Sequence, residues 1–182
     1  KGIVVATTLR VESAWRDGTS HLLQTLMRYG AGNVIHHKAD PVVVIMERSP
    51  FGLDGVIEEV LDAFEVNYTI EGADFLADGD LSGVSKIIVP SDQPRSVYQA
   101  LADNRQRIED WVKGDWRILE IHGAVSSPDD DWSDLVLPGG FSAVDLDSDG
   151  DDTVVAGGHP RLDEIAAGTD LLWGDGHDKR LS

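Results

Sequence analysis

The sequence contains no cysteine. This absence excludes disulfide bonds, thiolate metal sites and any reaction that uses a cysteine nucleophile. Long apolar runs are missing too, since none approaches the roughly 18 residues that a membrane-spanning helix needs. Positive charge is scarce: 15 lysine and arginine residues stand against 33 aspartate and glutamate residues, for a formal net charge of −18. Because phosphate binding requires a basic surface, this balance argues against nucleic acid as a partner.

The acidic residues are mostly aspartate, with 24 aspartates against 9 glutamates, and arginine outnumbers lysine 10 to 5. A surface rich in aspartate and poor in lysine suits a high-salt environment, such as a marine one, because ions screen the repulsion between carboxylates. An acidic cytoplasmic, extracellular or cell-surface protein from an ordinary organism is the alternative. Composition therefore leaves the localisation open.

Hydrophobic patterns between residues 41 and 121 predict an α/β fold with a mainly parallel sheet. Apolar runs of strand length alternate there with segments in which apolar residues recur at helical spacing. The predicted strands are residues 41–46, 66–70, 86–90 and 117–121, and the predicted helices are residues 53–64 and 97–112. The run PVVVIM at 41–46 is continuous, which is typical of a strand buried on both faces of a parallel sheet. Right-handed crossover connections are expected between the strands.

The segments on either side of this alternation are assigned to the same domain. Residues 1–40 are predicted to add a strand at 2–11 and a helix that begins near Thr19 and Ser20, packed against the main body at 41–182. After Ser127, the sequence SPDDDW predicts a short helix, since serine can cap it and proline suits its first turn. The stretches LPGGFSAVDL and DTVVAG are predicted to form a C-terminal β-hairpin around a polar loop.

Three loops are predicted to meet at the carboxyl ends of the strands, where open parallel α/β sheets bind their ligands. They are ERSPFG at 47–52, PSDQPR at 90–95 and HGAVSS at 122–127. As candidate ligand-binding groups they supply Glu47, Arg48, Ser91, Gln93, Arg95 and the backbone of Gly123. The alternative is that these polar residues only cap their loops.

His122 is the candidate catalytic residue, because it ends a predicted strand and precedes the small residues Gly123 and Ala124. Imidazole titrates near neutral pH and can act as a general acid or base. A carboxylate such as Asp92 or Asp175 could assist it, and Asp175 and His177 belong to a C-terminal tail that could reach the same crevice. The alternative is a structural His122, whose ring bonds a loop carbonyl or packs under the SPDDDW helix.

Four motifs in order along the chain resemble the class I glutamine amidotransferase-like superfamily, and most closely its ThuA-like (trehalose-utilisation) branch. They are EIHGA at 120–124, Trp132, GGF at 139–141 and the pair His159–Pro160. The resemblance extends over residues 42–162 and implies a flavodoxin-like sheet and a ligand site that includes Trp132 and His159. The chain departs from the superfamily at two positions. His122 stands where the nucleophilic cysteine belongs, and Arg161 stands where a carboxylate belongs.

An aspartate-rich loop, DLDSDGDD at 145–152, begins like a calcium-binding loop. Calcium prefers hard oxygen ligands at alternate positions and a glycine at the sharp turn. The candidate metal ligands are Asp145, Asp147, Asp149 and Asp151, which makes calcium the candidate cofactor. An EF-hand has glutamate at the twelfth position, where this chain has Ala156. A solvated acidic hairpin tip is the alternative.

These observations lead to three functional hypotheses. The first is a non-catalytic ligand-binding or interaction domain on a degenerate amidotransferase-like scaffold, whose partner is a small polar ligand such as a carbohydrate or another domain of a larger protein. The second is a ThuA-like enzyme that acts on a sugar or glycoside with His122 as acid or base. The third is a surface module stabilised by calcium. We favour the first because the cysteine and the late carboxylate of the parent chemistry are both missing.

Overall fold

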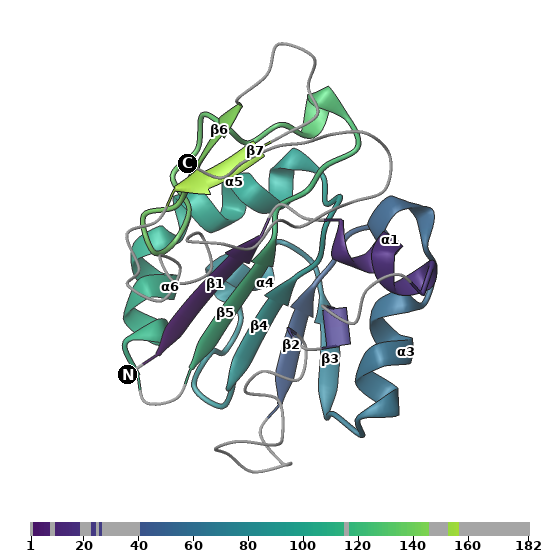
Figure 1. Ribbon diagram of the computed structural model, residues 1–182. Coiled ribbons are helices and arrows are strands. Elements are labelled where there is room, and N and C mark those ends of the chain that lie inside the picture. Colours follow the sequence, from purple (N-terminus) through teal and green to yellow (C-terminus); the bar gives the residue numbers. More distant parts are fainter. Residues whose placement is uncertain are drawn as a thin grey trace, which may run out of the picture.

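Five parallel strands form the central sheet, in the order β1-β5-β4-β2-β3 (Figure 1). The structure is a computed structural model that describes residues 2–7, 10–18, 23–24, 26, 41–114, 117–145 and 153–156, with only the backbone for 143–145 and 153–156. The strands are β1 (Ile3–Thr7), β2 (Val42–Ile45), β3 (Tyr68–Glu71), β4 (Lys86–Val89) and β5 (Ile118–His122). The predicted α/β, flavodoxin-like fold is confirmed, and β2, β4 and β5 are neighbouring parallel strands as expected.

Side chains alternate between the two faces of the sheet and build one apolar cluster on each face. On one face, Val43, Ile87 and Leu119 pack with the helices α5 (Arg95–Asp103) and α6 (Arg105–Val112). On the other face, Val42, Val44 and Ile88 pack with α1 (Val11–Arg16) and α3 (Val56–Ala63). Figure 1 shows the resulting three layers, with α1 and α3 on one side and α5 and α6 on the other.

The N-terminal strand is a member of the sheet itself. β1 lies at the edge beside β5, in a register that pairs Ile3 with Ile118 and Thr7 with His122. The predicted strand at 2–11 is too long, because β1 ends at Thr7 and α1 begins at Val11. Of the helix predicted near Thr19 and Ser20, the described residues 23, 24 and 26 are helical, and the rest lies outside the described residues.

Two further predictions differ in detail from the structure. The helix predicted at 97–112 is divided into α5 and α6 at Asn104, whose side chain donates to the carbonyl of Ala100 at 2.9 Å. Asparagine competes in this way with the regular hydrogen bonds of a helix. The SPDDDW helix is the single 3-10 turn η2 (Pro128–Asp130), in which the Ser127 hydroxyl accepts the predicted capping hydrogen bond from Asp129 N.

The remaining elements are short. They are the 3-10 turn η1 (Pro50–Gly52), the helix α4 (Phe75–Asp78) and the strands β6 (Ser142–Asp145) and β7 (Thr153–Ala156). β6 and β7 pair antiparallel, as predicted for the C-terminal hairpin, although β6 begins later than the predicted stretch. Among the described residues, no helix has the length and apolar character that crossing a membrane requires.

Candidate functional site

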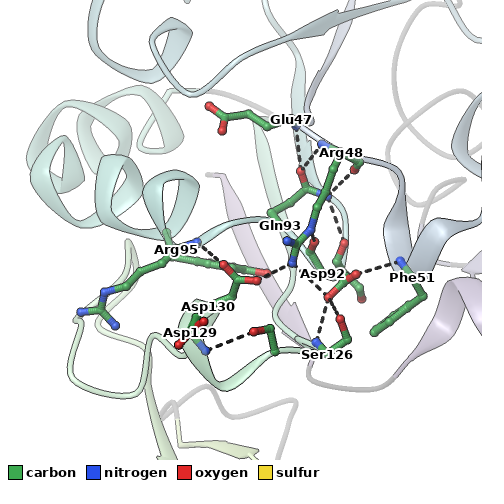
Figure 2. Close-up of polar contacts among 12 residues, drawn as sticks. Glu47, Arg48, Phe51, Asp92, Gln93, Arg95, Ser126, Asp129 and Asp130 are labelled. Carbon is green, nitrogen blue, oxygen red and sulfur yellow. Dashed lines mark hydrogen bonds and ion pairs between the residues drawn. The ribbon is translucent and has the colours of Figure 1, made fainter.

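The loops that follow β2, β4 and β5 meet at the carboxyl ends of the strands (Figure 2). The chain leaves β2 toward β3 and then crosses back to β4, so the topological switch lies between β2 and β4. Ligands of open α/β sheets bind at such a switch. Here the fully buried side chain of Gln93 spans it: its Oε1 accepts from Glu47 N at 2.8 Å, and its Nε2 donates to the Arg48 carbonyl at 2.9 Å. The amide therefore bridges the two loops across the switch.

Asp92 connects all three loops through one buried carboxylate, which is 6% exposed. Its oxygens accept hydrogen bonds from Ser126 N at 2.8 Å, from Ser126 Oγ at 2.5 Å and from Phe51 N at 3.1 Å. Arg48 Nη2 donates to the same carboxylate at 3.2 Å and to Asp130 at 2.6 Å. Asp92 and Phe51 both have positive φ angles, 59° and 50°. Non-glycine residues keep this strained conformation only where surrounding contacts hold it, as they do here.

The other predicted binding residues at this edge also have partners within the protein. Glu47 is exposed, and its carboxylate accepts from Ala73 N at 3.3 Å and from Ser96 Oγ at 3.2 Å. The Arg95 guanidinium donates to both carboxylate oxygens of Asp134, at 2.7 and 2.8 Å. The structure thus brings Glu47, Arg48, Gln93 and Arg95 together as predicted, and most of their polar groups are engaged with one another or with neighbouring loops.

His122 points away from this edge, into the layer between the sheet and α1. Its side chain is 0% exposed, and Nδ1 lies 2.7 Å from Oε1 of Glu12 in α1. Nε2 lies 2.6 Å from Oε1 of Glu120, which shares the same face of β5. The second oxygen of Glu120 lies 2.5 Å from Nζ of Lys86, which also donates to the carbonyl of Leu26 at 2.8 Å. We call these four residues, Glu12, His122, Glu120 and Lys86, the buried charged chain.

The geometry of the buried charged chain favours a protonated histidine. A neutral imidazole has one donor and one acceptor nitrogen, whereas an imidazolium donates from both. Both nitrogens of His122 face carboxylate oxygens at hydrogen-bond distance. Charges therefore alternate along the chain and sum to zero, which is the condition under which ionised groups are tolerated in a protein interior.

The pKa shifts of His122, Glu120 and Glu12 agree with this assignment, whereas burial lowers the pKa of Lys86 against the effect of Glu120. Burial acts to lower the pKa of His122, but Glu12 and Glu120 outweigh it and raise the pKa to about 9. Burial acts to raise the pKa of Glu120, but Lys86 and His122 outweigh it and lower the pKa to about 2. The pKa of Glu12 is also lowered, since His122 and the hydrogen bond from Ser91 N outweigh its burial. All three groups are therefore ionised at neutral pH.

The partners of His122 differ from those predicted. The assisting carboxylate was expected to be Asp92 or Asp175, and the structural alternative expected a loop carbonyl; the ring nitrogens instead bond Glu12 and Glu120. Glu120 could have been found from the sequence, because residues two apart on a strand share a face. Glu12 could not have been found in this way, because residues 2–11 are predicted to be a strand and no helix is predicted at position 12.

Gly123 and Trp132 are used for packing on the opposite face of the sheet. Trp132 is buried, stacks on Tyr98 with ring centroids 5.5 Å apart and donates from Nε1 to the Gly123 carbonyl at 2.8 Å. Gly123 N donates to the Thr7 carbonyl of β1 at 2.6 Å, so this N–H is engaged within the sheet. Ser91 is buried as well, with its backbone N–H donated to Glu12.

Several predicted residues lie outside the described residues: Asp147, Asp149, Asp151, His159, Asp175 and His177. Asp145 is described only by its backbone, as the last residue of β6. Within the described part of the chain, no group of three or more histidine, aspartate or glutamate side chains could hold a metal ion. The calcium loop therefore remains a prediction from the sequence.

Comparison of the chain with family models, with curated proteins and with solved structures finds no match. The strand-end loops and the buried charged chain are therefore the basis for a functional proposal. The strand-end loops expose polar groups, whereas the buried charged chain confines His122, the candidate catalytic residue, to the interior.

Proposed function

We propose that this chain is a non-catalytic ligand-binding or interaction domain on a degenerate class I glutamine amidotransferase-like scaffold. The supporting observation is the burial of His122, which stands where that superfamily carries its nucleophile. A general acid or base must reach the proton that it transfers, whereas this ring is 0% exposed and bonds only Glu12 and Glu120 through its nitrogens. The chain also has no cysteine that could act instead.

The surface that we assign to binding is the rim of the strand-end loops, defined as Glu47, Arg48, Arg95, Ser126 and Asp129. Below this rim, Gln93 and Asp92 are buried and hydrogen-bonded across the loops. A partner therefore contacts the rim from outside and does not enter between β2 and β4. The side chains of Arg48 and Arg95 are 38% and 36% exposed, and they alternate with carboxylates. This mixture suits a carbohydrate or the polar surface of another domain.

A turnover assay separates this proposal from the ThuA-like enzyme. The protein is incubated with glutamine or with trehalose from about pH 5 to about pH 9, the range in which histidine acid–base chemistry operates. We expect release of ammonia or glucose to be no greater than with a His122→Asn variant. Turnover that His122→Asn abolishes, while the variant stays folded, would establish the enzyme and refute the proposal.

A binding titration tests the rim directly. Trehalose is added to isotope-labelled protein, and the amide shifts of Glu47, Arg48 and Ser126 are followed by NMR. Saturable shifts at these residues that disappear in Arg48→Ala support a carbohydrate ligand. Arg16→Ala is the matched control, because Arg16 is similarly exposed, at 41%, and pairs with Glu59 on the helical layer. Shifts at Glu47 and Ser126 that persist in Arg48→Ala would show that Arg48 does not bind the sugar, and the absence of saturable shifts at the rim would refute a carbohydrate ligand there.

A further inference from the structure

Helix α1 is attached to the sheet through one buried carboxylate. Oε1 of Glu12 lies 2.7 Å from His122 Nδ1 in β5 and accepts from Ser91 N, after β4, at 3.0 Å. Val11 and Ala14 are also buried, and Trp15 is partly buried against the apolar cluster on this face of the sheet. The attachment of α1 therefore combines apolar packing with one buried charged contact.

The rest of the buried charged chain belongs to the sheet. Glu120 in β5 and Lys86 in β4 contact one another at 2.5 Å on adjacent strands. Lys86 thus compensates Glu120 whether or not α1 is in place. The charge of Glu12, by contrast, is compensated by the imidazolium of His122.

We propose that the Glu12–His122 contact is a pH-sensitive latch, which holds α1 on the sheet and releases it when the imidazolium loses its proton, while the sheet stays folded. When the His122 ring is neutral, one of its nitrogens is an acceptor that faces a carboxylate oxygen, which also only accepts. The buried charged chain then has one uncompensated negative charge. Glu120 is retained by Lys86, so Glu12 is the carboxylate that moves to water. Each release transfers one proton to solvent.

The charged and titratable groups around His122 come from four elements. The ring faces Glu12 of α1 and Glu120 of β5, with Lys86 of β4 behind Glu120. From α5 on the opposite face, the Tyr98 hydroxyl donates to the His122 backbone carbonyl at 3.4 Å, and burial raises its pKa above the ordinary value of 10.0. Burial lowers the pKa of Lys86, although Glu120 opposes this shift. His122 and Lys86 are therefore the two cations of this set, and His122 is the one that contacts Glu12.

The direction of the pH effect follows from linkage. The closed form binds the proton more tightly than a solvated histidine does, since the pKa of His122 is about 9 against an ordinary value of 6.5. The equilibrium for opening α1 is therefore lowest below that ordinary value and rises by at most about tenfold per pH unit as the pH approaches the raised one. The rise ends above the raised value, where His122 is neutral in both the closed and the open form.

Hydrogen exchange measured by mass spectrometry tests the latch on the whole chain. Protection factors, corrected for the intrinsic pH dependence of exchange, are measured from about pH 6 to about pH 9. We expect protection of the α1 amides of Ala14 and Asp17 to fall over this range, while that of β5 is retained. The Glu12→Gln variant should show low α1 protection with no pH dependence. Glu59→Gln is the control, since it removes only an exposed pair with Arg16 of the same helix, at 3.7 Å.

Three results would overturn the proposal: constant α1 protection in the wild type, an equal fall in β5, which signals global unfolding, or a Glu12→Gln curve that matches the wild type. If Glu12→Gln does not fold, the wild-type series still tests the proposal, because either of the first two results overturns it. The Glu59→Gln control must follow the wild-type curve.

Discussion

Replacing Lys86 with methionine removes one charge from the buried charged chain and keeps the length of the side chain. Lys86 is 0% exposed and lies 2.5 Å from Glu120. Without the ammonium, the interior contains two carboxylates and one imidazolium, so one negative charge is uncompensated. Breaking a buried ion pair on one side typically destabilises a protein by about 3–5 kcal/mol. We expect Lys86→Met to lower the free energy of unfolding by about that amount.

The double variant Lys86→Met/Glu120→Met distinguishes charge imbalance from loss of packing. It removes one positive and one negative charge and leaves Glu12 and His122 as a compensated pair. Since replacement of a whole buried ion pair by apolar side chains is often close to neutral, the double variant should be more stable than Lys86→Met by about 2 kcal/mol or more. If the loss of stability in the double variant equalled the sum of the losses in Lys86→Met and Glu120→Met, the two charges would not interact. That result would refute the reasoning.

Urea denaturation followed by circular dichroism supplies the free energies, provided that the slopes with denaturant are equal among the variants. Lys113→Met is the control for removing a lysine. Its ammonium lies 2.7 Å from Asp110, but the two side chains are 67% and 59% exposed. An exposed pair contributes about 0–1 kcal/mol, so this variant should be close to the wild type. A loss at position 113 as large as that at position 86 would contradict the role given to burial.

Three further predictions concern pH, packing and calcium. The contribution of His122 to stability is fully present below its ordinary pKa of 6.5 and is lost as pH rises through about 9. The contribution of Glu120 to stability is fully present above its ordinary pKa of 4.5 and is lost as pH falls through about 2. Urea midpoints should therefore be highest between these two ordinary values, and a maximum above pH 9 would be inconsistent with the assigned charges. Gly123→Ala would place a methyl group 2.5 Å from the Trp132 ring, so thermal unfolding should show a loss of about 1–3 kcal/mol, and an unchanged melting temperature would contradict the packing described. Millimolar Ca²⁺ should raise the melting temperature of the wild type and not that of Asp147→Ala, because a ligand that binds only the folded state stabilises it; equal behaviour of the two proteins would argue against a specific site.

The alternation of strands and helices between residues 41 and 121 could be predicted from the sequence alone. Each of these elements has a local signature: the continuous apolar runs of β2 and β4 and the helical spacing in α3 are visible without any partner. The meeting of the loops at 47–52, 90–95 and 122–127 followed from the same prediction, because the carboxyl ends of parallel strands share one edge of the sheet. Lys86 and Glu120 are charged residues in otherwise apolar strands, and such residues require a buried partner.

Only the tertiary structure decided where His122 points and what it contacts. Glu12 precedes it by 110 positions, and no local pattern connects the two. The position of β1 beside β5 is likewise non-local, and it brings α1 over the face of the sheet that carries Glu120 and His122. Periodicity reports which face of a strand a residue occupies, but the group that faces it depends on how distant segments pack. The sequence by itself therefore determined the strands and helices between residues 41 and 121 and the meeting of their loops, whereas the packing of α1 decided that the histidine at the end of β5 is enclosed between carboxylates.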